Sequence, residues 1–397
     1  MSYHFLLDLA LILLSTKLLG LLSKSFSLPG VVGSLLAGLF LGPAFFNILH
    51  QTDLILKLSE LGVIVLMFTA GMEADVTELK KSGISSLIIA VLGVVMPLLF
   101  GFGTAYFFNR PGIIENDASA SLLLQNIFIG VILTATSVSI TVETLKELGK
   151  LSAHASSAIL GAAILDDILG IVALTIITSL ADASLNVWGV LLKILLFFVI
   201  ASFFGFLFYV LFNRWSRRHE EDRRRFVIIA FVMCLLMSYI AEEYFGVADI
   251  TGAFIAGLLI SSTERQTYIV KRFETLSYLL LSPIFFASIG LKVTIPRMST
   301  SLILFTILLL LAAIISKLLG CGLGAKLCKY TTRESFQIGS GMVSRGEVAL
   351  IVANKGSTLG LISSVIFGPI VIMVIITTLI APILLKIAFR ERKREQS

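Results

Sequence analysis

Long apolar runs recur along the whole of this sequence, and they constrain its fold more than any other feature. Runs of about 17–25 apolar residues are each long enough to cross a hydrocarbon layer of about 30 Å as a helix. Hydrophobic residues make up 57% of the 397 residues and charged residues 14%, whereas a soluble domain carries about 25% charged residues. The sequence therefore predicts an all-α polytopic membrane protein.

Turn residues such as Pro29-Gly30 and Pro111-Gly112 divide the apolar runs into about thirteen predicted membrane spans. The first run holds Asp8 and Lys17 and lacks a basic leader, so it reads as a span and not as a signal peptide. The predicted spans are 4–22, 29–47, 53–72, 84–108, 119–144, 155–180, 186–212, 224–245, 247–263, 271–291, 300–327, 334–356 and 361–388.

Lysine and arginine gather in the loops that follow odd-numbered spans, above all in the polar linker 213–225. The other loops hold little beyond Arg110, Lys292, Arg297 and Lys355. Because cytoplasmic loops are the basic ones, we expect the N-terminus outside, the short tail 389–397 in the cytoplasm, and a multi-pass protein of the inner (plasma) membrane. These loops account for the net charge of +6, so no nucleic-acid partner is expected.

Two pairs of spans resemble one another at the same offset. The second span, with G-V-V-G-S-L-L-A-G, resembles the ninth, with T-G-A-F-I-A-G-L-L-I-S. The third ends M-F-T-A-G-M-E and the tenth ends I-F-F-A-S-I-G. The offset of seven spans is odd, so the copies would face opposite ways across the bilayer. Inverted repeats of this kind are typical of secondary transporters with alternating access.

Charged residues deep inside a span are costly and mark function by default. Asp166 and Asp167 stand side by side within I-L-G-A-A-I-L-D-D-I-L-G-I, about 18 Å along their helix and so near the bilayer midplane. Lys317, in another span, can pair with one of them. The remaining carboxylate can hold either a proton or a cation, which is the chemistry of an ion–proton exchanger. A static ion pair between helices is the structural alternative.

Two polar stretches accompany these charges. T-A-T-S-V-S at 134–139 offers hydroxyl oxygens and can loosen helix carbonyls, or simply join helices. The segment 339–350 contains glycines with Arg345 and Glu347, which are two positions apart and would not face each other on a regular helix. Either this helix is interrupted, or each side chain pairs elsewhere; Glu347 is a candidate partner for Lys317 or Arg345. A purely structural role for the two stays open.

Other functions fit the residues less well. A sodium-coupled organic-anion symporter would want further substrate-binding groups, and a cation channel would want a continuous pore. No H-E-x-x-H or G-x-S-x-G motif lies in a span, so an enzyme is not expected. The cysteines Cys234, Cys321 and Cys328 have no metal-binding spacing, and no cofactor is predicted.

Taken together, the motifs resemble those of the monovalent cation:proton antiporter-2 family, in order and over nearly the whole chain. Besides the Asp-Asp pair and T-A-T-S-V-S, they are E-L-G-V-I-V-L-M-F-T-A-G-M-E at 60–73, T-G-A-F-I-A-G at 251–257, F-F-A-S-I-G at 285–290 and S-R-G-E at 344–347. The resemblance implies a homodimeric, thirteen-helix Na⁺/H⁺ antiporter with inverted repeats and two crossing discontinuous helices. Exchange of K⁺ instead of Na⁺ stays open.

By the same resemblance, Asp167 would be the main carrier of Na⁺, Li⁺ or protons, and Asp166 would pair with Lys317 until sodium arrives. Thr136 and Ser137 would lie where the two unwound helices cross. An Asp-Asp pair goes with electrogenic exchange. The glutathione-gated potassium-efflux relatives carry Gln-Asp and a nucleotide-binding domain; this chain has Asp-Asp and ends at residue 397, so we expect it outside that branch.

The resemblance also implies a division of the single transporter domain 1–388. Its helices within about 4–72 and 224–291 would form a scaffold and dimerisation unit, and those within about 84–180 and 300–388 a mobile ion-translocating core. A linker helix at about 186–212 would join the two.

Overall fold

The computed structural model describes residues 3–26, 28–74, 76–110, 112–114, 117–181, 187–218, 223–292 and 298–390. Every regular element in these ranges is a helix, which confirms the all-α prediction. Ten helical stretches of the described chain are long and apolar enough to cross a membrane, and two shorter apolar helices accompany them. The number of about thirteen spans stays a prediction.

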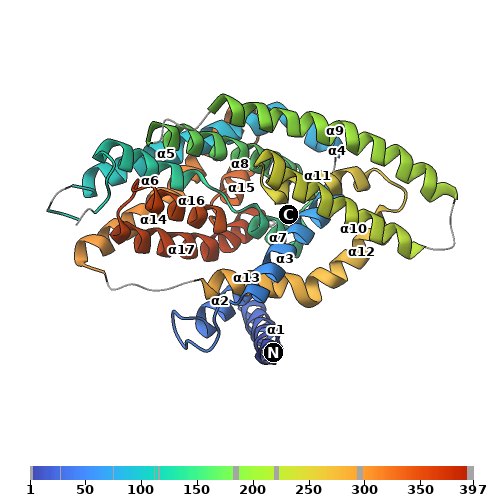
Figure 1. Cartoon of the computed structure of the whole chain (residues 1–397), viewed down its shortest axis with the longest axis horizontal. Coiled ribbons are helices and arrows are strands. Elements are labelled where there is room, and N and C mark those ends of the chain that lie inside the picture. Colours follow the sequence, from blue (N-terminus) through green and yellow to red (C-terminus); the bar gives the residue numbers. More distant parts are fainter. Residues whose placement is uncertain are drawn as a thin grey trace, which may run out of the picture.

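One group of helices packs into what we call the scaffold bundle, on the right and lower side of Figure 1. Its members come from two distant parts of the chain, as the packing of α3 against α11 and of α2 against α13 shows. They are α1 (His4–Ser25), α2 (Gly30–Leu41), α3 (Asp53–Glu73), α10 (Arg223–Tyr239), α11 (Asp249–Ser261), α12 (Gln266–Leu276) and α13 (Ser282–Leu291), with the π-helical turns η1 (Ile240–Tyr244) and η2 (Ser277–Leu281).

The other group, which we call the core bundle, lies to the left in Figure 1 and is centred on the pair α5 and α14. It comprises α5 (Gly83–Phe108), α6 (Leu122–Thr134), α7 (Val138–Glu147), α8 (His154–Ala181), α14 (Thr300–Leu327), α15 (Thr332–Gly341), α16 (Glu347–Thr358) and α17 (Ser364–Phe389). The short α4 (Val76–Lys81) connects the bundles in sequence, and the long α9 (Val187–Arg218) contacts both α8 and α11.

Several helix ends differ from the predicted spans; α2, for one, ends at Leu41, before Gly42-Pro43, instead of near 47. The helix α9 continues to Arg218 instead of ending near 212, and α7 continues to Glu147 instead of ending near 144. Apolar content alone set the predicted ends, but arginine, lysine and glutamate are good helix formers and extend a helix beyond the hydrocarbon. At the end of α9, Trp215 also packs edge-on against Phe226, with ring centroids 4.7 Å apart.

Glycines bring the scaffold helices into backbone contact, and they do so twice in the same way. In the pair α2–α13, a side chain at Gly38 would overlap the backbone of Ala287. In the pair α11–α3, one at Gly257 would overlap the backbone of Phe68. The sequence matches relate α2 to α11 and α3 to α13. The pair α2–α13 therefore corresponds to the pair α11–α3, with each helix replaced by its match from the other half of the chain.

Gly38→Ala is expected to destabilise the protein, because the new methyl group must push α2 away from α13. Overpacking of this kind costs about 1–3 kcal/mol, which thermal unfolding of the detergent-purified protein would report as a lowered Tm. Gly103→Ala is the matched control, since a methyl group there meets no atom within 4 Å. Equal Tm values for the two variants would contradict this packing.

Candidate functional site

Two helices of the core bundle are interrupted at the same depth. The residues between α6 and α7 are extended, with ψ near 133° at Ala135 and 101° at Ser137. A second interruption separates α15, which ends at Gly341, from α16, which begins at Glu347. Threonine and serine compete for backbone hydrogen bonds and glycine costs helix stability, so both sequences favour a break.

The two interrupted segments cross and hold each other by hydrogen bonds. The amide of Ser137 donates to the carbonyl of Ser344 at 2.8 Å, and the hydroxyl of Thr141 donates to the carbonyl of Gly341 at 2.7 Å. A side chain at Gly346 would collide with that of Ser137. The expected pair of crossing discontinuous helices is therefore present, and glycine at 346 is what permits the close approach.

Arg345 lies at this crossing, fully buried. Its Nη1 donates to the carbonyl of Val343 at 2.7 Å and its Nη2 to the carbonyl of Leu133 at 2.8 Å. Leu133 lies in the last turn of α6, where the backbone leaves partial negative charge and acceptors without helical partners, whereas Val343 lies in the second interruption, two residues beyond α15. The guanidinium thus joins the end of α6 to the second interruption, and the hydroxyl of Thr378 on α17 donates to the Arg345 carbonyl.

Asp166 and Lys317 form an ion pair between α8 and α14. The Nζ atom of Lys317 lies 2.8 Å from Oδ1 and 3.0 Å from Oδ2 of Asp166. Lys317 is 0% exposed and Asp166 is 2% exposed. Thr136, in the first interruption, lies close enough to Asp166 to interact with it, and its hydroxyl donates to the carbonyl of Thr134 at 3.5 Å. The carboxylate is therefore satisfied chiefly by a full cation.

Asp167 is in a different situation, although it is the next residue of α8. It is partly exposed, and it makes no hydrogen bond or ion pair with any residue in the described part of the chain. Consecutive positions of a helix point about 100° apart, so its carboxylate is directed away from the one that Lys317 engages. One aspartate is paired and the other is left to bind something else.

Oxygen atoms for a cation are available around the crossing. Thr134 donates its hydroxyl to a carbonyl of its own helix, and the Ser137 and Ser139 hydroxyls lie 3.3 Å apart. The buried hydroxyls of Ser340 and Ser344 have no hydrogen-bond partner among the described residues. Carboxylate, hydroxyl and carbonyl oxygens are the ligands that hard cations prefer.

The structure brings together Asp166, Lys317 and Thr136, and it joins the crossing segments through Ser137 and Arg345. Glu347 begins α16, but its side chain lies outside the described part of the structure. Among the described residues, Arg345 donates to the carbonyls of Val343 and Leu133, and Lys317 donates to Asp166; a pairing of Glu347 with either cation stays a prediction.

Sequence reasoning missed three residues that complete this site. They are Gly93, where an added side chain would meet the pair, and Cys321 and Thr378. The Cys321 sulfur fills the space beside Gly93. Of the three, only Thr378 could have been found from the sequence, because it is one of two adjacent threonines in an apolar run. Gly93 and Cys321 are small residues of a kind common in membrane helices, so nothing in the sequence marks them.

The segment that carries the first interruption is also the most interior one. In the described chain, 78% of the span window within Leu122–Glu147 is buried, compared with 17% in α1. Asp167 lies on α8, which packs against this segment, and a proton or a cation there would neutralise a carboxylate that is costly to hold alone within a membrane span. The geometry therefore suits a site that binds one or the other.

Comparison with known proteins places this geometry in context. The family model "Sodium/hydrogen exchanger, transmembrane" matches residues 10–391. The Na⁺/H⁺-K⁺ antiporter GerN of Bacillus cereus is 38% identical over 390 residues, which is 98% of this chain and 97% of that protein. The Na⁺/H⁺ antiporter of Enterococcus hirae is 37% identical over 385 residues, 95% of this chain and 96% of that protein.

A solved structure shares the fold. The sodium proton antiporter MjNhaP1 from Methanocaldococcus jannaschii, at pH 8, superposes with a TM-score of 0.68 over 95% of this chain and 94% of that chain. At 19% sequence identity, this likeness speaks for the fold alone.

Proposed function

The chain belongs to the sodium/hydrogen exchanger family, and from this premise we propose that it is a secondary active antiporter that exchanges Na⁺ or Li⁺ for protons. One observation carries the proposal. A partly exposed, unpaired Asp167 stands beside a buried Asp166–Lys317 pair, at the crossing of two interrupted helices. Competition between Na⁺ and a proton for one carboxylate needs only the groups that this site contains.

In the proposed cycle, Na⁺ displaces protons at Asp167 and loosens the Asp166–Lys317 pair. Hydroxyls and carbonyls near Thr136 and Ser137 complete the coordination of the ion. The loaded site then changes access, releases Na⁺ and returns protonated. An empty return is disfavoured because an unpaired carboxylate in a low-dielectric interior is costly, while a neutralised one is not. Exchange is electrogenic in this account.

Alternating access would come from movement of the core bundle against the scaffold bundle. The reciprocal packing of α2 with α13 and of α11 with α3 supports an inverted repeat, which is the architecture of transporters with a central site. The basic loops support an N-terminus outside and a cytoplasmic tail in the plasma membrane. We further propose that two copies dimerise through the scaffold bundle.

Potassium is the second candidate cation. The relative GerN is named a Na⁺/H⁺-K⁺ antiporter, and a more distant relative at 31% identity is named K⁺/H⁺ antiporter 1. Carboxylate and hydroxyl oxygens bind either ion, and the size of the coordination shell decides between them. We place Na⁺ and Li⁺ first because the relatives at 37–38% identity are both named as Na⁺/H⁺ antiporters.

Proteoliposomes with imposed Na⁺, Li⁺ or K⁺ gradients test the proposal. Lumenal pH is expected to change in response to Na⁺ and Li⁺, to saturate with concentration, and to depend on membrane potential. Flux without saturation or proton coupling would indicate a channel, and sodium flux that requires an organic anion would indicate a symporter. A response to K⁺ alone would overturn the assignment of sodium.

A further inference from the structure

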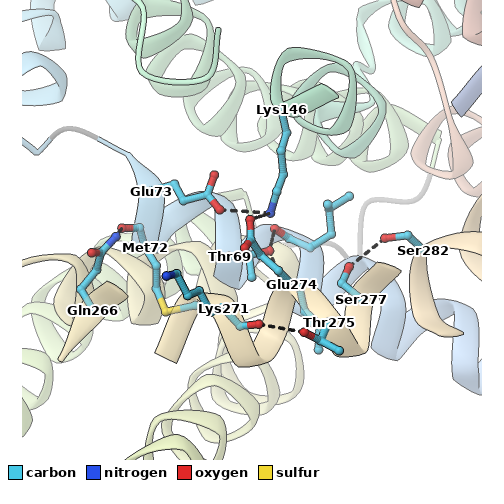
Figure 2. A network of polar contacts seen from close by, with 12 residues as sticks. Thr69, Met72, Glu73, Lys146, Gln266, Lys271, Glu274, Thr275, Ser277 and Ser282 are labelled. Carbon is cyan, nitrogen blue, oxygen red and sulfur yellow. Dashed lines mark hydrogen bonds and ion pairs between the residues drawn. The ribbon is translucent and has the colours of Figure 1, made fainter. Parts of the chain in front are cut away.

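The cytoplasmic end of α7 makes charged contacts that the ion site does not use, and each one reaches a scaffold helix. Lys146 lies 3.0 Å from Glu73 at the end of α3 and 3.2 Å from Glu274 on α12, measured from Nζ to Oε1. Figure 2 shows these side chains converging from three helices. The next residue, Glu147, accepts a hydrogen bond from the amide of Gly30 at 2.7 Å.

These contacts cross between the bundles and not within one. The helix α7 follows the first interruption and belongs to the core bundle, whereas α2, α3 and α12 belong to the scaffold bundle. The scaffold side is itself fixed, because Gln266 of α12 donates to the carbonyl of Met72 on α3 at 2.9 Å (Figure 2). Lys146 therefore contacts two scaffold helices that are joined to each other, and Glu147 contacts a third.

These contacts are shielded from water to different degrees. The side chains of Lys146 and Glu73 are 24% and 22% exposed, and that of Glu274 is 42% exposed. One lysine shared by two carboxylates forms a small network, and Glu147 meets the positive N-terminal end of α2. Opposite charges in this setting hold a defined orientation.

The surroundings leave α7 room to move once these contacts break. Close-packed interfaces resist sliding, but a cavity of about 300 Å³ lies beside α7, between it and α1, α2 and α13. Glu143 and Glu147 line it from the core side, and Lys17 and Lys24 from the scaffold side. The charged contacts, and not shape alone, hold α7 in place here.

We propose that Lys146 and Glu147 are positioning residues that latch the core bundle to the scaffold bundle in this conformation and must release for the ion site to change access. The latch rests on the proposed transport function, because it acts on the movement of the core. It consists of Lys146 with Glu73 and Glu274, and Glu147 with the Gly30 amide. Its strength sets how the protein is distributed between this conformation and the alternative one.

Distance measurement by electron paramagnetic resonance tests the latch. Spin labels at Ser152→Cys on the core side and Lys271→Cys on the scaffold side, both exposed positions, report the separation of the bundles in the full-length protein with its native cysteines replaced. Each conformation gives its own distance between the labels. Lys146→Gln is expected to raise the population with the alternative distance, relative to the population with the present one, by roughly three- to tenfold, as for loss of a partly buried charged contact.

Three further variants make the test specific. Lys81→Gln is the matched control, because the ion pair of Lys81 with Glu78, at 2.8 Å, lies within α4; its distances should equal those of the parent. Exchanging the charges, Lys146→Glu with Glu73→Lys, should restore the parent distribution. Glu147→Ala should act in the same direction as Lys146→Gln, and it serves if the lysine variant does not fold.

The measurement also separates the latch from the transport proposal. Suppose that the parent distances shift with Na⁺ and pH but that Lys146→Gln and Glu147→Ala leave the distribution of distances unchanged. The proposal of a latch is then wrong, and the proposal that the core bundle moves is retained. If the parent distances do not respond to Na⁺ or pH at all, movement of the core is wrong, and the latch with it.

Discussion

Asp167→Asn is expected to abolish Na⁺-driven proton flux in proteoliposomes. Asparagine keeps the size of the side chain but can neither bind a proton reversibly nor offer a full negative charge to sodium. Removing one partner of a desolvated charge contact costs about 2–5 kcal/mol, which corresponds to roughly a thirtyfold or greater loss in affinity. The loss of the exchangeable proton removes coupling altogether, so flux should fall to the level of empty liposomes.

The control for this variant is Glu60→Gln, which removes a carboxylate from an exposed position of α3. It should exchange ions at the parental rate. Because Asp167 has no partner in the described structure, Asp167→Asn should also fold with parental stability, which thermal unfolding can establish. Retained exchange in a correctly folded Asp167→Asn protein would remove this residue from the mechanism.

The second large effect is expected at the Asp166–Lys317 pair. Lys317→Met leaves a buried carboxylate without its cation, and Asp166→Asn leaves a buried ammonium without its anion. Breaking a buried pair from one side costs about 3–5 kcal/mol, whereas replacing both partners is often nearly neutral. Each single variant should therefore unfold at a clearly lower temperature, and the double variant should recover most of the loss.

Transport measurements distinguish the role of the Asp166–Lys317 pair from that of Asp167. Lys317→Met should still bind sodium, because Asp167 is intact, but it should change the charge moved per turnover or the pH profile of exchange. Currents and lumenal pH recorded on the same proteoliposomes give that ratio. Single variants as stable as the parent, with an unchanged charge ratio, would show that the pair contributes neither to folding nor to coupling.

Much of the fold could be predicted from the sequence because the bilayer restricts what a chain can do. Apolar runs and basic loops suffice to place helices, and a charge within such a run is conspicuous. Lys317 was for this reason a candidate partner for one of the two aspartates, and the glycines near Arg345 left a broken helix as one of two possibilities; the resemblance chose Asp166 and the break. Helix ends at Arg218 and Glu147 were missed, since they lie beyond the apolar signal.

The contacts that hold the site together were less accessible. Arg345 donates to the carbonyl of Leu133, 212 positions away, and a carbonyl has no sequence signature. Lys146 lies just beyond the predicted span 119–144, where a charge usually faces water; only tertiary structure brings Glu73 and Glu274 to it. Sequence thus indicates which charges are buried, but not what each of them touches.

The most direct test of the central claim is proton release on sodium binding. The claim is that one carboxylate binds either a proton or Na⁺. Adding Na⁺ to the purified, weakly buffered protein should release protons in proportion to the sodium bound, and should do so in Glu60→Gln but not in Asp167→Asn. Sodium binding without proton release in the parent protein, or undiminished release in Asp167→Asn, would contradict it.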